Sequence, residues 1–171
     1  MDLIGSVQQA VAHFKQLGSS PPVRIIANYD ADGIAAAALL LKTFYREGRT
    51  CSASVVGQLT PAYIQELSRE PYTIYFFLDL GATPLSSLTT QLSTKHLFVL
   101  DHHHFDKMVT SEQQIFHVNP YLCGMDGTKD ISASGVAYLF SCCLNSSNRD
   151  LSVLALIGAF GDAQEHLGFQ G

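Results

Sequence analysis

The chain of 171 residues has no tryptophan and only ten lysines and arginines, against fifteen aspartates and glutamates, for a net charge of −5. Proteins that bind nucleic acid through its phosphates usually carry a basic surface. The composition therefore argues against strong non-specific binding of nucleic acid by this chain alone. It leaves room for an enzyme that acts on phosphates, because bound divalent cations offset the charge of clustered carboxylates.

Cysteines are few, and the four present form no C-x-x-C pair. This spacing argues against a zinc knuckle or a disulfide framework, and we expect Cys51, Cys123, Cys142 and Cys143 to be small buried side chains. No apolar run reaches the roughly 18 residues that span a bilayer. The N-terminus also lacks the basic and apolar segments of a secretory signal. We expect a single domain over residues 1–171, located in the cytoplasm and without a membrane partner.

Several catalytic signatures are also missing. The chain has no G-x-S-x-G elbow and no catalytic-cysteine context, so nucleophilic serine or cysteine chemistry has no support. The turn after the first apolar run lacks G-x-G-x-x-G, which argues against a dinucleotide-binding fold of the Rossmann type in its strict sense.

What the chain does have is a series of short apolar runs separated by segments with helical periodicity. This alternation predicts a Rossmann-like α/β fold, a mainly parallel five-stranded sheet with helices on both faces. The final helical segment is nearly all apolar, so we expect it to be buried. The predicted strands cover 23–27, 51–57, 72–78, 97–100 and 115–119, and the predicted helices cover 3–17, 33–48, 61–67, 84–92, 132–144 and 150–160.

Acidic and imidazole groups follow three of the predicted strands, and one more aspartate ends the last helix. Because ligands in open α/β sheets bind at the carboxyl ends of the strands, these groups are expected to meet. Each has a simpler interpretation alone: an aspartate before a helix is a good N-cap, one after a strand forms turns, and an Asp-His cluster also occurs in solvated loops. Their common position favours a site. The groups are Asp30, Asp32, Asp79, Asp101, His102, His103 and Asp162.

The chemistry of this set favours hard divalent cations. Carboxylates with one or two imidazoles suit Mn²⁺ or Mg²⁺ better than a thiolate zinc site, and the carboxylates outnumber the needs of one ion. A pair of cations about 3.5–4 Å apart clamps a phosphate and activates water for in-line displacement. Asp162 at a helix C-terminus opposes the helix dipole, which a cation would relieve. We therefore predict phosphoester hydrolysis.

Four ordered motifs resemble those of the DHH phosphoesterase superfamily, and most closely the RecJ-like single-strand nucleases of archaeal type. The motifs are Asp30-Ala31-Asp32-Gly33, Asp79, Asp101-His102-His103 and Gly161-Asp162. The resemblance implies the N-terminal DHH domain and two Mn²⁺ ions, with Mg²⁺ as the alternative metal. The family's C-terminal DHHA1-type domain, which closes over the site, is expected to be absent.

The resemblance also implies roles for the motif residues. Asp30 would bind one ion, Asp79 would bridge, and Asp32, His102 and Asp162 would bind the other. Among the catalytic residues, His103 would face the scissile phosphate and Asp101 would support the imidazoles. Asn28 stands where archaeal relatives often have histidine, so it is expected to be a substrate contact or a weak metal contact. His104 lies outside the motif and is expected to be a loop residue.

By this resemblance, the chain is a manganese-dependent exonuclease domain acting on single-stranded DNA or RNA in DNA repair or replication. One alternative is a phosphodiesterase for short oligonucleotides or cyclic dinucleotides. The other is a non-catalytic replisome scaffold related to the replicative-helicase cofactor of the superfamily. Archaeal RecJ-like proteins are associated with GINS, so a GINS-like replisome partner is expected in either case.

Overall fold

The computed structural model describes residues 2–105 and 115–164. Helices and strands alternate along most of the chain, and two 3-10 helices, η1 and η2, lie in its last third. The elements are α1 (Leu3–Gln16), β1 (Val23–Asn28), α2 (Ala31–Arg46), β2 (Cys51–Val56), α3 (Pro61–Arg69), β3 (Ile74–Leu78), α4 (Leu85–Gln91), β4 (His96–Leu100), β5 (Ile115–Val118), η1 (Pro120–Cys123), α5 (Ala133–Leu144), η2 (Ser146–Leu151) and α6 (Ser152–Gly161).

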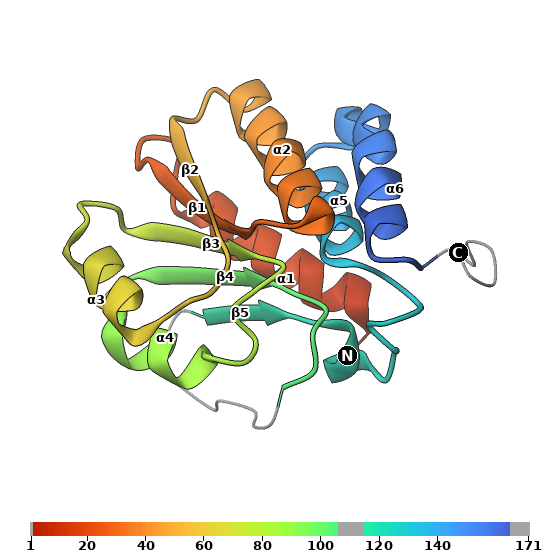
Figure 1. Cartoon of the computed structure of the whole chain (residues 1–171). Coiled ribbons are helices and arrows are strands. Elements are labelled where there is room, and N and C mark those ends of the chain that lie inside the picture. Colours follow the sequence, from red (N-terminus) through yellow and green to blue (C-terminus); the bar gives the residue numbers. More distant parts are fainter. Residues whose placement is uncertain (1, 106–114, 165–171) are drawn as a thin grey trace.

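The five strands form one parallel sheet in the order β2-β1-β3-β4-β5. Helices α1, α2 and α5 pack on one face, and α3 and α4 pack on the other (Figure 1). The fold class predicted from the sequence is therefore confirmed. Strands β3 and β4 are almost wholly buried because helices cover both of their faces, which explains why their sequences read as unbroken apolar runs.

Aromatic rings fill the larger of the two cores, on the α1, α2 and α5 face. Phe76 and Phe98 stack across neighbouring strands with ring centroids 4.5 Å apart, and Phe140 of α5 meets Phe76 edge-on. Such pairs add about 0.5–1.5 kcal/mol each beyond their buried area. The smaller core, under α3 and α4, contains Tyr75 and Phe77. Both cores fix the strand ends from which the polar residues emerge.

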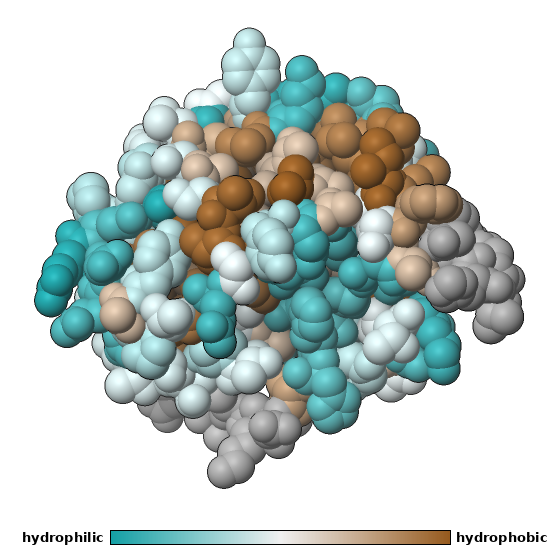
Figure 2. Space-filling model, in the orientation of Figure 1, coloured by the Kyte–Doolittle hydropathy of each residue, from teal (hydrophilic) through white to brown (hydrophobic). Residues whose placement is uncertain are grey.

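Helix α6 differs from the sequence prediction, which was wrong about its burial. Only Gly158 is fully buried, while Val153, Leu156, Ile157 and Phe160 are each more than half exposed. The helix packs against α2 and α5 along one side, and no described element covers its other side. We call those four residues the outer face of α6; Figure 2 shows brown side chains over this helix. Within the described ranges, no helix is long and apolar enough to cross a membrane.

Candidate metal centre

The carboxyl ends of β1, β3 and β4 lie side by side in the sheet, and the predicted site residues extend from this edge. Asp79 follows β3 and Asp101 follows β4. Asp32 lies in the first turn of α2, and Asp162 is the C-cap of α6. The fold thus brings together residues that are far apart in the sequence, as the sequence predicted. Asp32, Asp79, Asp101 and His102 are buried, with exposed fractions of 6% or less.

His102 lies at the middle of this cluster. Its Nδ1 is 2.7 Å from the backbone carbonyl oxygen of Gly127, and because a carbonyl only accepts, Nδ1 carries the hydrogen. This leaves Nε2 pointing at two carboxylates, 3.2 Å from Asp79 Oδ1 and 3.1 Å from Asp162 Oδ2. A histidine held in this way by a backbone carbonyl is the usual arrangement of a metal ligand.

Two buried atoms of the cluster have no hydrogen-bond partner among the described residues, His102 Nε2 and Asp79 Oδ1. Buried polar atoms are nearly always satisfied, so this pair indicates a missing partner. Donor atoms within 4.8 Å of one another form two groups, Asp79-His102-His103 and Asp32-His102-Asp162. Carboxylates and imidazole together suit Mn²⁺ or Mg²⁺. The residues present therefore fit a divalent cation.

The charges of the cluster are out of balance without a cation. Burial raises the pKa of Asp79, against the lowering effect of His102, and the nearby charges of Asp32 and Asp30 raise it further. Burial alone would lower the pKa of His102, but Asp79, the Gly127 carbonyl and Asp162 outweigh it and raise that pKa to about 9. Burial also raises the pKa of Asp162. With a pKa of about 9, His102 of the metal-free site keeps a proton at neutral pH, in place of the positive charge that a cation would supply.

Asp32 is held by the N-terminus of α5, a contact that the sequence did not predict. Its carboxylate accepts hydrogen bonds from Ser132 Oγ at 2.9 Å, Ala133 N at 2.7 Å and Ser134 N at 3.1 Å. Helix N-termini attract anions through free N–H groups and the helix dipole. The small residues at the start of α5 were the available signal. Gly158 of α6 also packs here, and a Cβ on it would overlap Asp32 and Ser134.

Asp101 acts as an anchor within the DHH segment. Its Oδ1 accepts from the backbone N–H of His102 and His103, at 2.8 and 3.1 Å, and Oδ2 accepts from Ala82 N at 2.8 Å. The same Oδ1 lies 2.8 Å from Nδ1 of His103. Asp101 therefore fixes the backbone of both histidines and the ring of His103. The side chain of His103 is half exposed, and its Nε2 takes no part in the contact with Asp101.

Asp30 and Asn28 lie at the open side of the site. Asp30 caps α2 by accepting from Gly33 N at 3.0 Å, so the capping interpretation holds for this residue. Asp30 belongs to neither of the two groups of possible metal donors. Asn28 Nδ2 donates to Asp30 Oδ2 at 2.6 Å and to Asp79 Oδ2 at 3.1 Å. Asn28 thus links two of the predicted ligands through its amide. His104 is exposed and meets Tyr121 edge-on, at 5.0 Å between ring centroids.

The backbone of Asp79 adopts a left-handed conformation, with φ of 58°. Non-glycine residues rarely occupy this region, which costs about 1 kcal/mol or more. The conformation turns the chain sharply after β3 and holds the carboxylate at the strand ends. Such a conformation is typical of residues whose position serves a site.

Comparisons with known proteins agree with this geometry. The profile of the DHH family, N-terminal domain, matches residues 22–159. An uncharacterized protein of Methanocaldococcus jannaschii is 32% identical over 149 residues, which are 83% of this chain and 33% of that protein. The chain thus spans about a third of the length of this relative.

Solved structures show the same fold. The exonuclease RecJ bound to manganese superposes with a TM-score of 0.79 at 21% identity, over 95% of this chain and 44% of that one. RecJ of Thermus thermophilus in complex with Mn²⁺ gives 0.75 at 22% identity, over 92% and 24%. CDC45 of Entamoeba histolytica gives 0.62 at 17% identity, over 95% and 32%.

The family profile covers most of the chain, and its range includes the motif residues of β1, β3 and β4, whose carboxyl ends lie side by side in the sheet. The chain therefore belongs to the DHH family, and residues 22–159 are its N-terminal domain.

Proposed function

We propose that the chain is a divalent-metal-dependent phosphodiesterase that hydrolyses single-stranded nucleic acid as an exonuclease domain. The observation that carries this proposal is the position of the Asp79 and Asp162 carboxylates next to His102 Nε2. Two of the buried atoms, His102 Nε2 and Asp79 Oδ1, have no hydrogen-bond partner among the described residues. Membership of the DHH family and the likeness to two manganese-bound RecJ structures support it. Mn²⁺ is the proposed metal, with Mg²⁺ as the alternative.

In this proposal Asp32, His102 and Asp162 would hold one ion, Asp30 would hold a second, and Asp79 would contribute to both. The bound ions would supply positive charge for the phosphate and lower the pKa of water. The chain's own residues orient these groups. Gly127 fixes the hydrogen on His102 Nδ1, so that Nε2 is free to bind, and the α5 N-terminus holds the Asp32 carboxylate in place.

His103 is the residue proposed to act on the substrate. Its interaction with Asp101 raises its pKa, against the lowering effect of burial, which favours the protonated ring, with a hydrogen on Nε2, more than in a free histidine. With Nδ1 held by Asp101, Nε2 is the nitrogen left to donate a hydrogen bond to a phosphate oxygen. A donor aimed at developing negative charge stabilises the transition state of phosphoryl transfer. We assign His103 this role and Asp101 that of orienting it.

Two alternatives remain as proposals. A phosphodiesterase for short oligonucleotides or cyclic dinucleotides would use the same centre. A non-catalytic replisome scaffold is supported by the likeness to CDC45, at a lower TM-score than the two manganese-bound RecJ structures, and by the uncovered outer face of α6. The scaffold has no use for a metal centre, so the presence of the acidic residues of all four motifs favours the enzyme. A GINS-like partner and a cytoplasmic location stay predictions.

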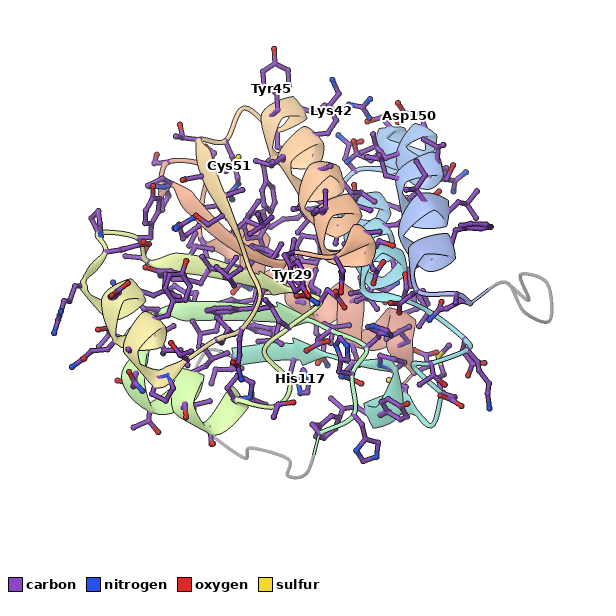
Figure 3. All side chains as sticks on the ribbon, in the orientation of Figure 1. Tyr29, Lys42, Tyr45, Cys51, His117 and Asp150 are labelled. Atoms are coloured by element: carbon purple, nitrogen blue, oxygen red, sulfur yellow. The ribbon has the colours of Figure 1, made fainter. Side chains whose placement is uncertain are left out.

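The experiment is hydrolysis of a dinucleotide and of end-labelled single strands of DNA and RNA, with Mn²⁺, with Mg²⁺ and with chelator. We expect activity with Mn²⁺ that Asp79→Asn reduces to background, because the bridging carboxylate is lost. The matched control is Asp150→Asn, the same chemical change at an exposed residue that pairs with Arg46 at 2.7 Å (Figure 3). Hydrolysis that survives chelator, or that Asp79→Asn leaves at the wild-type rate, would contradict the proposal.

A further inference from the structure

A cavity of about 540 Å³ opens beside the metal centre. Asn28, Asp79 and His103 belong both to its lining and to the centre. The rest of its wall comes largely from the loop after β2 and from the loop after β3. Its size lies within the roughly 300–1,000 Å³ of small-molecule sites. A group bound there would lie directly next to a phosphate at the centre.

Away from the centre, the described wall of this cavity is mostly neutral, and His104 is the titratable side chain that lines it. Among the described residues, no lysine or arginine lines it. Leu59, Leu80 and Pro84 contribute apolar surface, and Gln58 and Thr83 contribute neutral polar groups. A phosphate would find no lysine or arginine on this described wall. A neutral ligand with flat apolar surface and a few hydrogen-bonding groups suits it better.

An exposed aromatic ring stands at the rim of this cavity. Tyr29 is 67% exposed and lies between Asn28 and Asp30 of the first motif. Its ring lies against Gly57 of the cavity wall, since a Cβ on Gly57 would be 3.5 Å from two ring carbons. Exposed aromatic rings beside a phosphate site are typical platforms for stacked bases.

We propose that this cavity, the nucleoside pocket, takes the base and sugar of the nucleotide whose phosphate lies at the metal centre, and that Tyr29 stacks on the base. The inference rests on the proposed function, because the metal centre must receive the phosphate. The nucleoside pocket would bind the base and sugar, the part of the substrate that the metal centre does not contact. The pocket recognises the nucleoside through a ring face, so it accepts each of the bases.

The test compares binding of a nucleoside 5′-monophosphate with binding of ribose 5-phosphate, which lacks the base, by calorimetry in the presence of Mn²⁺. We expect the wild-type chain to bind the nucleotide about 5- to 140-fold more tightly, the range that base stacking on an aromatic side chain supplies. Tyr29→Ala should bring this ratio close to one. Tyr29→Phe should preserve it, because stacking does not need the hydroxyl.

Tyr45→Ala is the matched control, since Tyr45 is a 76% exposed tyrosine near the C-terminal end of α2, away from the strand ends (Figure 3). It should leave the ratio unchanged. Both tyrosines are exposed, so neither variant should alter the melting temperature. Equal binding of the two ligands by the wild type, or a ratio that Tyr29→Ala leaves within about twofold of wild type, would overturn the pocket.

Dinucleotide hydrolysis by the same variants separates this inference from the proposed function. A base-dependent ratio that needs Tyr29, without any hydrolysis, would support the pocket and contradict the proposed enzyme. Metal-dependent hydrolysis without any base-dependent ratio would support the enzyme and overturn the pocket.

Discussion

Gly127 sets the position of the central histidine, although it has no side chain of its own. Its carbonyl oxygen accepts from His102 Nδ1 at 2.7 Å and from Gln164 Nε2 at 2.9 Å. A Cβ on Gly127 would overlap the His102 carbonyl oxygen, so alanine forces the two segments apart. Losing the partner that orients a metal-bound histidine typically costs 10- to 100-fold in affinity.

We therefore expect Gly127→Ala to weaken Mn²⁺ binding by about 10- to 100-fold, measured by calorimetric titration at about pH 8. Lys129→Ala, at an exposed position of the same loop, is the control and should retain wild-type affinity. Unchanged affinity in Gly127→Ala would mean that His102 does not depend on this carbonyl.

The raised pKa of His102 makes the stability of the metal-free chain depend on pH. A group with a higher pKa in the folded than in the unfolded chain stabilises the fold below its unfolded pKa, and that contribution disappears as pH rises through the folded pKa. For the pKa of His102 these values are 6.5 and about 9. The pKa of Asp79 is also raised, so its effect has the same sign.

We expect the melting temperature of the chelator-treated chain to fall from pH 6.5 to about pH 9. Bound Mn²⁺ needs deprotonated ligands, so the stabilisation that excess Mn²⁺ gives should grow over the same window. Thermal scans at several pH values with and without Mn²⁺ measure both trends, and His102→Gln should flatten the metal-free trend. A metal-free melting temperature that rises with pH would refute this assignment.

At the scale of elements, the outer face of α6 has a direct consequence for stability. Ile157 is 54% exposed, whereas Phe140 of α5 is fully buried. Substitutions at exposed positions usually change the free energy of unfolding by less than about 0.5 kcal/mol, and loss of a buried phenylalanine costs about 3–5 kcal/mol. We expect Ile157→Asn and Phe140→Ala to follow these two ranges in urea denaturation. A core-sized loss for Ile157→Asn would show that this face is covered in solution.

Strands β3 and β4 were predictable because each is an apolar run that helices bury on both faces, Ile74–Leu78 and His96–Leu100. The exposure of the outer face of α6 could not be predicted in this way. An all-apolar helix indicates burial only if a neighbour covers every side, and local sequence says nothing about which elements will pack together.

The site was predictable to a similar degree. Polar residues at strand ends meet by the geometry of a parallel sheet, which is why Asp79 and His102 could be placed together. The contacts of Asp32 with the α5 N-terminus join positions about 100 residues apart. Ser132 carried only the general signal of a helix cap. Long-range hydrogen bonds of this kind depend on tertiary packing and leave no periodic pattern.

For the whole molecule, the distribution of charge limits the substrates it can hold. Arg24 is engaged with Glu70 and Arg46 with Asp150, and no lysine or arginine of the described ranges lines the nucleoside pocket. Binding of a long strand gains affinity from each phosphate contact, at a salt slope of about −0.7 per contact for single strands. With few described cations near the site, extra nucleotides should add little affinity.

We therefore expect kcat/KM for a strand of about 20 nucleotides to be no higher than for a dinucleotide, because each added phosphate gains little without a cation to contact. Steady-state rates for both substrates at low and moderate salt test this. Rapid processive degradation of the long strand by this chain, abolished by Asp32→Ala, would reveal a groove that the charge distribution does not indicate.

The left-handed conformation of Asp79 places the stability of the fold in conflict with the needs of the site. Asp79→Gly would relieve about 1 kcal/mol of backbone strain and remove a buried carboxyl from a crowded cluster. We expect this variant to melt at a higher temperature than the wild-type chain when both are metal-free, and to lose its stabilisation by Mn²⁺. Asp162→Gly, at a residue with φ of −89°, gives the comparison without strain relief. A lower metal-free melting temperature for Asp79→Gly would show that no such conflict exists.

If the conflict exists, an aspartate at position 79 lowers the stability of the metal-free fold. In a lineage that used the domain only as a scaffold, mutation would tend to replace it, so only a metal-dependent function would maintain this aspartate.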